Sequence, residues 1–104
     1  MIDPSKISEP ERSLVVEFAN QMRDLDTIAL LAKPTTRLSK SAKHKLWDRV
    51  QKQIDKPMTE SFQALVQLQK SANSELREIA VKAINKDSAA IEELRRLANR
   101  IKQL

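Results

Sequence analysis

The chain has 104 residues, with 19 Lys plus Arg against 14 Asp plus Glu, and it contains neither glycine nor cysteine. A chain of this length can form one hydrophobic core, so we expect a single domain over residues 1–104. Phosphate-binding loops, nucleophile elbows and hairpin-rich β folds all rely on glycine, and its absence argues against them. With no cysteine and a single histidine, the usual zinc sites cannot form, so we expect no metal and no cofactor.

The start of the chain differs from an export signal. It carries acidic side chains and two prolines instead of a basic region followed by an apolar one. The longest apolar run, residues 28–32, is far shorter than the roughly 18 residues that a membrane span requires. We therefore expect a cytoplasmic protein with no membrane span, and a flexible N-terminal segment over residues 1–7.

Apolar residues recur at helical spacing along the chain, which predicts an all-α fold. Ser8 and Glu11 have the spacing of a capping box, and they predict a first helix over residues 9–32. Pro34 is expected to end this helix, because proline disfavours the α conformation of the residue before it. The linker to the next helix would then cover residues 33–38. The predicted inward stripe of the first helix is Leu14, Phe18, Met22, Leu25, Ala29 and Ala32.

Two further helices are predicted in the middle of the chain. Ser39 is placed to cap a second helix over residues 39–56, and Pro57 is expected to end it. A third helix, capped by Thr59, is predicted over residues 59–85. Its inward stripe is Met58, Phe62, Leu65, Gln69, Ala72, Leu76, Ile79 and Ala83.

The third helix is either continuous or broken at residues 73–74. Asn73 and Ser74 are residues that often cap helices, which favours a break. The apolar stripe crosses them without a change of phase, which favours one helix. We expect one helix on balance.

The last helix starts at Asp87 or Ser88 and is predicted over residues 88–104. The linkers between the four helices are short, which favours antiparallel packing of neighbours. The sequence therefore predicts a single-domain, antiparallel bundle of about four helices.

Positive charge is concentrated in one segment. Residues 33–56 hold 8 basic and 2 acidic side chains, a net charge of +6, whereas the whole chain carries +5. Four of the basic residues fall within an arc of about 60° on the second helix, and Lys40 leads into them. This ridge either contacts a polyanion or is an ordinary solvated face. The candidate polyanion-binding residues are Lys40, Lys45, Arg49, Lys52 and Lys56.

Three apolar residues are candidates for a partner interface. Val16 and Leu30 lie on the side of the first helix opposite its inward stripe, so that helix is either central in the bundle or covered by a partner or a second copy. Trp47 is the only tryptophan; it lies either in the core or on the surface as an anchor for a partner.

No residues in the sequence form a recognisable catalytic group. His44 is expected to be exposed among lysines, and no base stands near the serines in sequence. We therefore expect a non-enzymatic helical module, acting as an adaptor, a regulator or a small assembly subunit that binds another protein or itself, with no small-molecule substrate. The alternative is a nucleic-acid-binding protein that uses the basic ridge for phosphate contacts.

Overall fold

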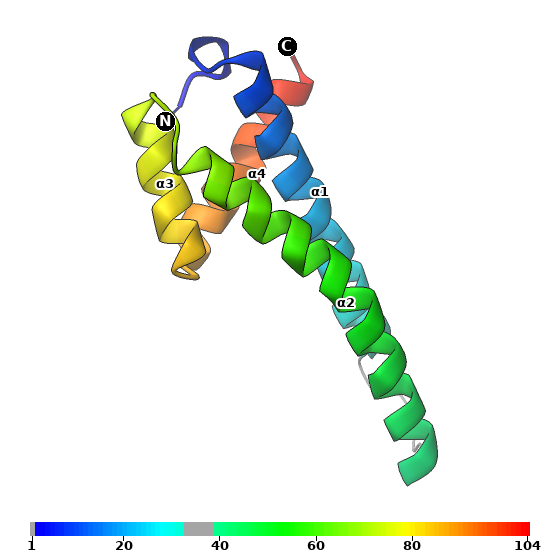
Figure 1. Ribbon diagram of the computed structural model, residues 1–104. Helices are drawn as coiled ribbons and strands as arrows, with labels where there is room; N and C mark the ends of the chain where they lie inside the picture. Colours follow the sequence, from blue (N-terminus) through cyan, green and yellow to red (C-terminus); the bar gives the residue numbers. More distant parts are fainter. Residues whose placement is uncertain (1, 33–38) are drawn as a thin grey trace.

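A computed structural model describes residues 2–32 and 39–104 of the chain (Figure 1). The described residues form a short 3-10 helix, η1 (Pro4–Lys6), and four α-helices, with no strand. The α-helices are α1 (Glu9–Ala32), α2 (Lys40–Leu68), α3 (Ser74–Ile84) and α4 (Ser88–Lys102). The prediction of an all-α bundle of about four helices is therefore confirmed. The predicted linker over residues 33–38 lies outside the described residues.

The molecule consists of a long two-helix arm and a four-helix end. Helices α1 and α2 run antiparallel, and the C-terminal part of α1 and the N-terminal part of α2 extend beyond α3 and α4 (Figure 1). At the other end α4 packs on α1, and α3 packs on both α2 and α4. The overall dimensions are 53 × 24 × 21 Å. Of the helices in residues 2–32 and 39–104, none combines the length and the apolar character needed to cross a bilayer.

The hydrophobic core lies at the four-helix end, where all four α-helices contribute to it. The six largest fully buried side chains are Val15, Phe18, Leu68, Leu76, Leu94 and Leu97. In the part of α2 before Pro57, the buried side chain is Val50. The arm is therefore a thin element with little core of its own, while the four-helix end holds most of the buried apolar surface.

Residues 2–7, which the sequence predicts to be flexible, pack on the core; Met1 lies outside the described residues. Ile2 and Ile7 are buried in the core. The Arg100 guanidinium donates to the Ile2 carbonyl oxygen, with an Nη2···O distance of 3.3 Å. Burial of two isoleucines offsets part of the entropy cost of ordering this segment, because each removes apolar surface from water.

Three predicted helix starts are confirmed by hydrogen bonds. Ser8 and Glu11 occupy the two capping-box positions of α1: the Glu11 amide donates to Ser8 Oγ at 3.3 Å, and the Ser8 hydroxyl, in place of its backbone amide, donates to the Glu11 carboxylate at 2.8 Å. Ser39 Oγ accepts from the Ala42 amide at the start of α2. The Asp87 carboxylate accepts from two amides at the start of α4. Short polar side chains therefore satisfy amides at these helix starts.

The predicted helix end at Pro57 is wrong, because α2 continues through it from Lys40 to Leu68. Proline removes one backbone donor from a helix interior, which ordinarily costs about 3 kcal/mol. Here the ring of Pro57 is buried, and the buried positions on either side of it, from Val50 to Leu68, keep one helical phase. Packing of both halves of α2 against α1 thus outweighs the local preference to stop, and Thr59 is not a helix cap.

The alternative of a break near residues 73–74 is the one that the structure confirms. Helix α2 ends at Leu68, and α3 begins at Ser74 with Asn73 as its N-cap. The Asn73 side chain accepts from the Leu76 amide at 3.2 Å. A capping amide therefore decides this boundary, and the continuous phase of the apolar stripe across it was misleading.

The turn between α3 and α4 places a lysine in a conformation that usually requires glycine. Lys86 has a φ of 64°. The Asp87 amide donates to the Lys82 carbonyl and the Lys86 amide to the Ala83 carbonyl, both at 3.0 Å, which is the hydrogen-bond pattern of a Schellman motif. A residue with a Cβ atom is disfavoured in this left-handed region, so the absence of glycine from the chain has a local energetic cost.

Replacing Lys86 with glycine is therefore expected to raise the free energy of unfolding by about 1 kcal/mol, because glycine adopts the left-handed conformation without a steric penalty. Urea denaturation followed by circular dichroism measures this change. Lys86→Ala is the matched control: it removes the same charge but keeps a Cβ atom, and it should give no such gain. A less stable Lys86→Gly variant would contradict the assigned turn.

Candidate functional site

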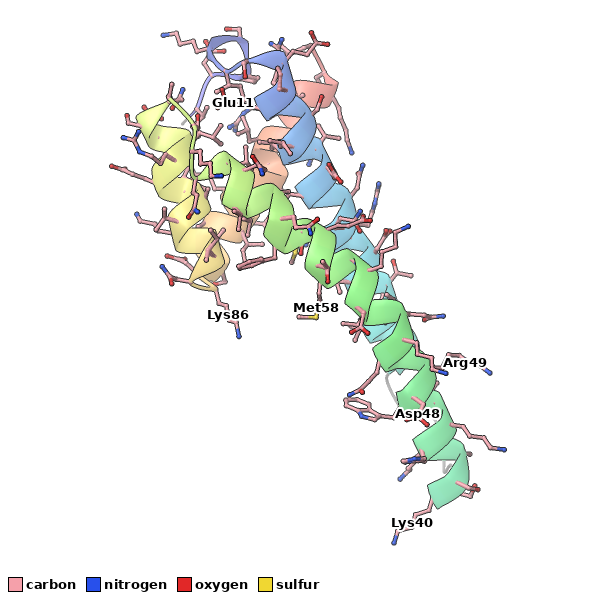
Figure 2. The ribbon with its side chains drawn as sticks, viewed as in Figure 1. Glu11, Lys40, Asp48, Arg49, Met58 and Lys86 are labelled. Carbon is pink, nitrogen blue, oxygen red and sulfur yellow. The ribbon has the colours of Figure 1, made fainter. Side chains whose placement is uncertain are left out.

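The predicted basic residues of α2 are all exposed. Lys45, Arg49, Lys52 and Lys56, here called the basic ridge, lie within an arc of about 60° and span about 16 Å of the helix axis. Lys40 is exposed at the tip of the arm (Figure 2), but it lies about 150° away from the ridge around the axis. The structure therefore groups four of the five predicted residues on one side of α2.

The ridge cations have no acidic partner among the described residues. Among the described residues, ion pairs join Asp26 with Arg95 and Glu92 with Arg96, and His44 contacts Asp48. Asp24 of α1 shares a shallow groove with Lys52 and Lys56, yet it forms no ion pair with either of them within residues 2–32 and 39–104. The four ridge cations are thus exposed and form no ion pair with another described residue, although carboxylates lie near them.

A second surface of α2 exposes large apolar side chains. Trp47, Met58 and Phe62 are 58%, 55% and 53% exposed, and the half-buried Ile54 lies on the same side. We call these four residues the apolar flank. Their spacings of seven, four and four residues place them on one stripe of the helix. Trp47 is therefore a surface residue, which is the second of the two alternatives left open by the sequence.

The basic ridge and the apolar flank lie on nearly opposite sides of α2, about 150° apart around its axis. Figure 2 shows this relation directly, because Arg49 and Met58 point away from opposite sides of the helix. Helix α1 packs along a third side. Two separate ligands can therefore contact α2 without competing for the same side chains.

The apolar flank continues toward the C-terminal half of α2 as a shallow hollow. Met58, Phe62 and Val66 recur at four-residue spacing and line this hollow. Polar residues Thr59, Gln63 and Gln67 line its other side. An apolar stripe with a polar border is the arrangement expected of a surface that binds another helix.

His44 is exposed, as predicted, and its Nε2 lies 3.8 Å from an Asp48 carboxylate oxygen. Asp48 lies four residues after His44, a spacing at which side chains of a helix meet, so this contact, which sequence reasoning missed, could have been predicted from the sequence. Within the described residues, no three histidine, aspartate or glutamate side chains come together in a way that could hold a metal ion.

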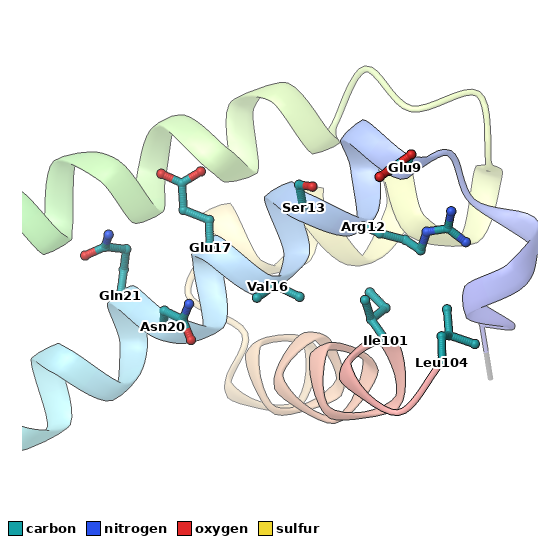
Figure 3. A pocket seen from close by; sticks show the side chains of 9 residues that line it. All are labelled: Glu9, Arg12, Ser13, Val16, Glu17, Asn20, Gln21, Ile101 and Leu104. Carbon is teal, nitrogen blue, oxygen red and sulfur yellow. The ribbon is translucent and has the colours of Figure 1, made fainter.

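Val16 and Leu30, the two predicted interface residues of α1, lie in different environments. Val16 is partly buried and points toward α4, where it lines a groove with Ile101 and Leu104 (Figure 3). Leu30 is 65% exposed on the arm. Because α1 packs against both α2 and α4, the apolar character of Val16 is explained by a central position of its helix.

One carboxylate is perturbed by contacts between distant parts of the chain. Glu11 of α1 accepts a hydrogen bond from the hydroxyl of Ser71, a buried residue in the loop between α2 and α3. This bond, together with those from Ser8, lowers the pKa of Glu11, while partial burial opposes the change. Arg77 also donates to the Ser71 carbonyl oxygen. Every partner is a fixed structural group, so we assign this cluster to stability.

Met58 and Phe62 are the surface residues that sequence reasoning missed, because both were assigned to the core of a third helix. The missing signal is the continuity of α2. Once Pro57 lies inside one helix, Trp47, Met58 and Phe62 fall on a single stripe beside the buried positions. The predicted end at Pro57 had separated Trp47 from the other two.

The chain matches no protein-family model, no curated protein and no solved structure.

Proposed function

We propose that this chain is a non-enzymatic, cytoplasmic helical module that binds another protein through the apolar flank of α2. The observation that carries the proposal is the exposure of Trp47, Met58 and Phe62, each more than half accessible, on one side of a protruding helix. Tryptophan and other large side chains are frequent at the centres of protein interfaces. An adaptor, a regulator and a small assembly subunit all fit such a surface.

The partner expected here is an amphipathic helix. The apolar flank presents side chains at the spacings with which two helices meet, and it extends over about 22 Å of axis from Trp47 to Phe62. Hydroxyl and amide side chains beside the hollow at Met58 can pair with polar groups at the edge of such a partner. Trp47 would serve as the anchor, because its indole ring supplies a large contact area.

Two features support a binding role over a catalytic one. The carboxylates with a lowered pKa, Asp3 and Glu11, accept hydrogen bonds from serines close to helix starts, which is a structural use. Within residues 2–32 and 39–104, the charged partner of His44 is Asp48, a surface aspartate on the same helix. General acid–base catalysis requires such groups to converge on a common substrate position.

The test compares a flank variant with a control variant of similar composition. Trp47→Ala with Phe62→Ala should weaken partner binding at least about tenfold, because two anchor side chains are truncated. Val81→Ala with Leu104→Ala removes exposed apolar groups elsewhere and should leave binding unchanged. Nuclease-treated extract is passed over each of the three proteins. Proteins that bind the wild type and the control, but not the flank variant, are then purified, and their affinity is measured by calorimetric titration.

The same variants separate a distinct partner from self-association. Light scattering across protein concentration would show a dimer that the flank variant alone disrupts if the partner is a second copy. Identical retention by all three proteins, with no change in oligomeric state, would refute the proposal that the apolar flank is the interface.

A further inference from the structure

The basic ridge is a second exposed surface that the proposed protein interface does not use. Lys45, Arg49, Lys52 and Lys56 follow one another along α2 with axial rises of about 6, 4.5 and 6 Å. All four are exposed, and the ion pairs among the described residues involve other side chains. A row of cations that form no ion pair creates a local positive potential that a polyanion can neutralise.

From this row we propose that the ridge binds the phosphate backbone of double-stranded nucleic acid. Successive charges along one strand are about 3.4 Å apart along the duplex axis, so a ridge about 16 Å long lies beside several phosphates. Lysine supplies three of the four cations, and lysine contacts phosphate as a point charge. The binding is therefore governed by the backbone and tolerant of base sequence.

The position of the ridge on the arm favours a duplex as its ligand. The arm extends beyond α3 and α4, so those two helices do not screen its tip (Figure 1). The acidic groups near the ridge are Asp24 of α1 and, on α2 itself, Asp48, Asp55 and Glu60, the last of which lies one turn after Lys56 and accepts a hydrogen bond from Gln21. Asp48 already contacts His44. Over residues 39–56 of α2, 6 basic side chains outnumber 2 acidic ones, so this part of the arm carries a net positive charge.

An anionic membrane is a poorer fit to the same cations. Helices that lie on a membrane insert an apolar face and place basic residues at its borders. Here Trp47 and Met58 lie about 150° from the ridge, so they cannot enter a bilayer that the ridge contacts. A grooved, rigid polyanion requires no apolar insertion beside the cations, and it is the ligand that this geometry fits.

The experiment measures binding by fluorescence anisotropy with a labelled DNA duplex of about 20 base pairs, which at 3.4 Å per pair is longer than the 53 Å protein. With four phosphate contacts, affinity should fall about 100-fold between about 50 and about 200 mM salt. A second duplex of unrelated sequence should bind equally well. No binding at the lower salt concentration would overturn the proposal, as would a strong preference for one sequence.

Two charge-reversed variants locate the contact. Lys45→Glu with Arg49→Glu should lower affinity at least about tenfold at low salt and reduce the salt slope by about two. Lys70→Glu with Lys82→Glu changes the net charge equally at exposed positions outside the ridge, and it should retain most of the binding. Equal losses in both variants would overturn the proposal, because net charge alone would then explain the binding. Circular dichroism verifies that both variants are folded.

Two further measurements, one with lipid vesicles and one with the flank variant, complete the experiment. Vesicles containing anionic phospholipid should bind more weakly than the duplex, and tighter ridge-dependent binding to vesicles would overturn the assignment to nucleic acid. Trp47→Ala with Phe62→Ala should leave duplex binding unchanged, because the two surfaces are on opposite sides of α2. This result distinguishes a failure of the nucleic-acid proposal for the ridge from a failure of the protein-interface proposal for the apolar flank.

Discussion

Replacing Phe18 with alanine is expected to lower the free energy of unfolding by about 3–5 kcal/mol, as truncation of a fully buried phenylalanine does. Phe18 is 1% exposed and belongs to the core cluster to which all four α-helices contribute. The substitution removes a ring from the four-helix end, where the buried apolar surface is concentrated. Since small domains are stable by only about 5–15 kcal/mol, the variant should melt at a much lower temperature.

The control for this experiment is the same substitution at Phe62, the other phenylalanine of the chain, which is 53% exposed. Its ring is largely in water already, so Phe62→Ala should cost less than about 1.5 kcal/mol. Thermal and urea denaturation of both variants gives the comparison. Similar losses at the two positions would contradict the core described here and the exposure of the apolar flank.

The second large effect is expected at Ser71, whose hydroxyl joins the loop after α2 to Glu11 at the start of α1. Ser71→Ala should lower the free energy of unfolding at neutral pH by about 1–3 kcal/mol, because the hydrogen bond to the Glu11 carboxylate and the one that Ser71 Oγ accepts from the Asn73 amide are both lost. Ser74→Ala, at an exposed serine three residues away, is the control and should change stability by less than about 0.5 kcal/mol.

The effect of Ser71→Ala should depend on pH in a defined direction. The hydrogen bond from Ser71 is the main reason that the pKa of Glu11 lies below its ordinary value of 4.5. The folded state therefore binds protons less readily than the unfolded state. The contribution is complete above pH 4.5 and is lost as the pH falls through the lowered pKa. Urea denaturation at neutral and acidic pH should show a smaller difference between the wild type and Ser71→Ala in acid, where the loss of the bond from the Asn73 amide still remains. A difference that does not change with pH would contradict this role.

The boundaries of α1 could be predicted from the sequence because local chemistry determines its start. The capping box of Ser8 and Glu11 marks the first turn, and the structure has the helix over Glu9–Ala32 as expected. The start of α4 followed from Asp87 in the same way, although that helix ends at Lys102 and not at residue 104. Helix caps involve residues a few positions apart, so they can be recognised without knowledge of the fold.

The course of α2 could not be predicted, because a contact between helices decides it. Local rules end a helix before Pro57, and the opposing contribution is burial of that proline in the packed face of α2. That contribution depends on where α1 lies, which the sequence does not specify at this position. Val15 shows the same limitation: it is fully buried but lay outside the predicted stripe of α1, since the stripe did not allow for packing of α1 against both α2 and α4.

The two candidate surfaces differ in how far the sequence could define them. The ridge from Lys45 to Lys56 lies within one helix on the same side of Pro57, so helical periodicity alone grouped its four cations. The apolar flank crosses Pro57, and its recognition required the continuity of α2. Lys40 was grouped with the ridge by proximity in sequence, whereas helical geometry places it on another side.

The arm has a consequence for how the molecule moves through water. Its radius of gyration is 16.1 Å, against about 13 Å for a compact chain of this length, and its longest dimension exceeds twice the next. Such a particle experiences more friction than a sphere of equal mass. On a gel-filtration column calibrated with globular standards, a monomer should therefore elute early, at the position of a heavier species, and its elution volume alone would be mistaken for a dimer.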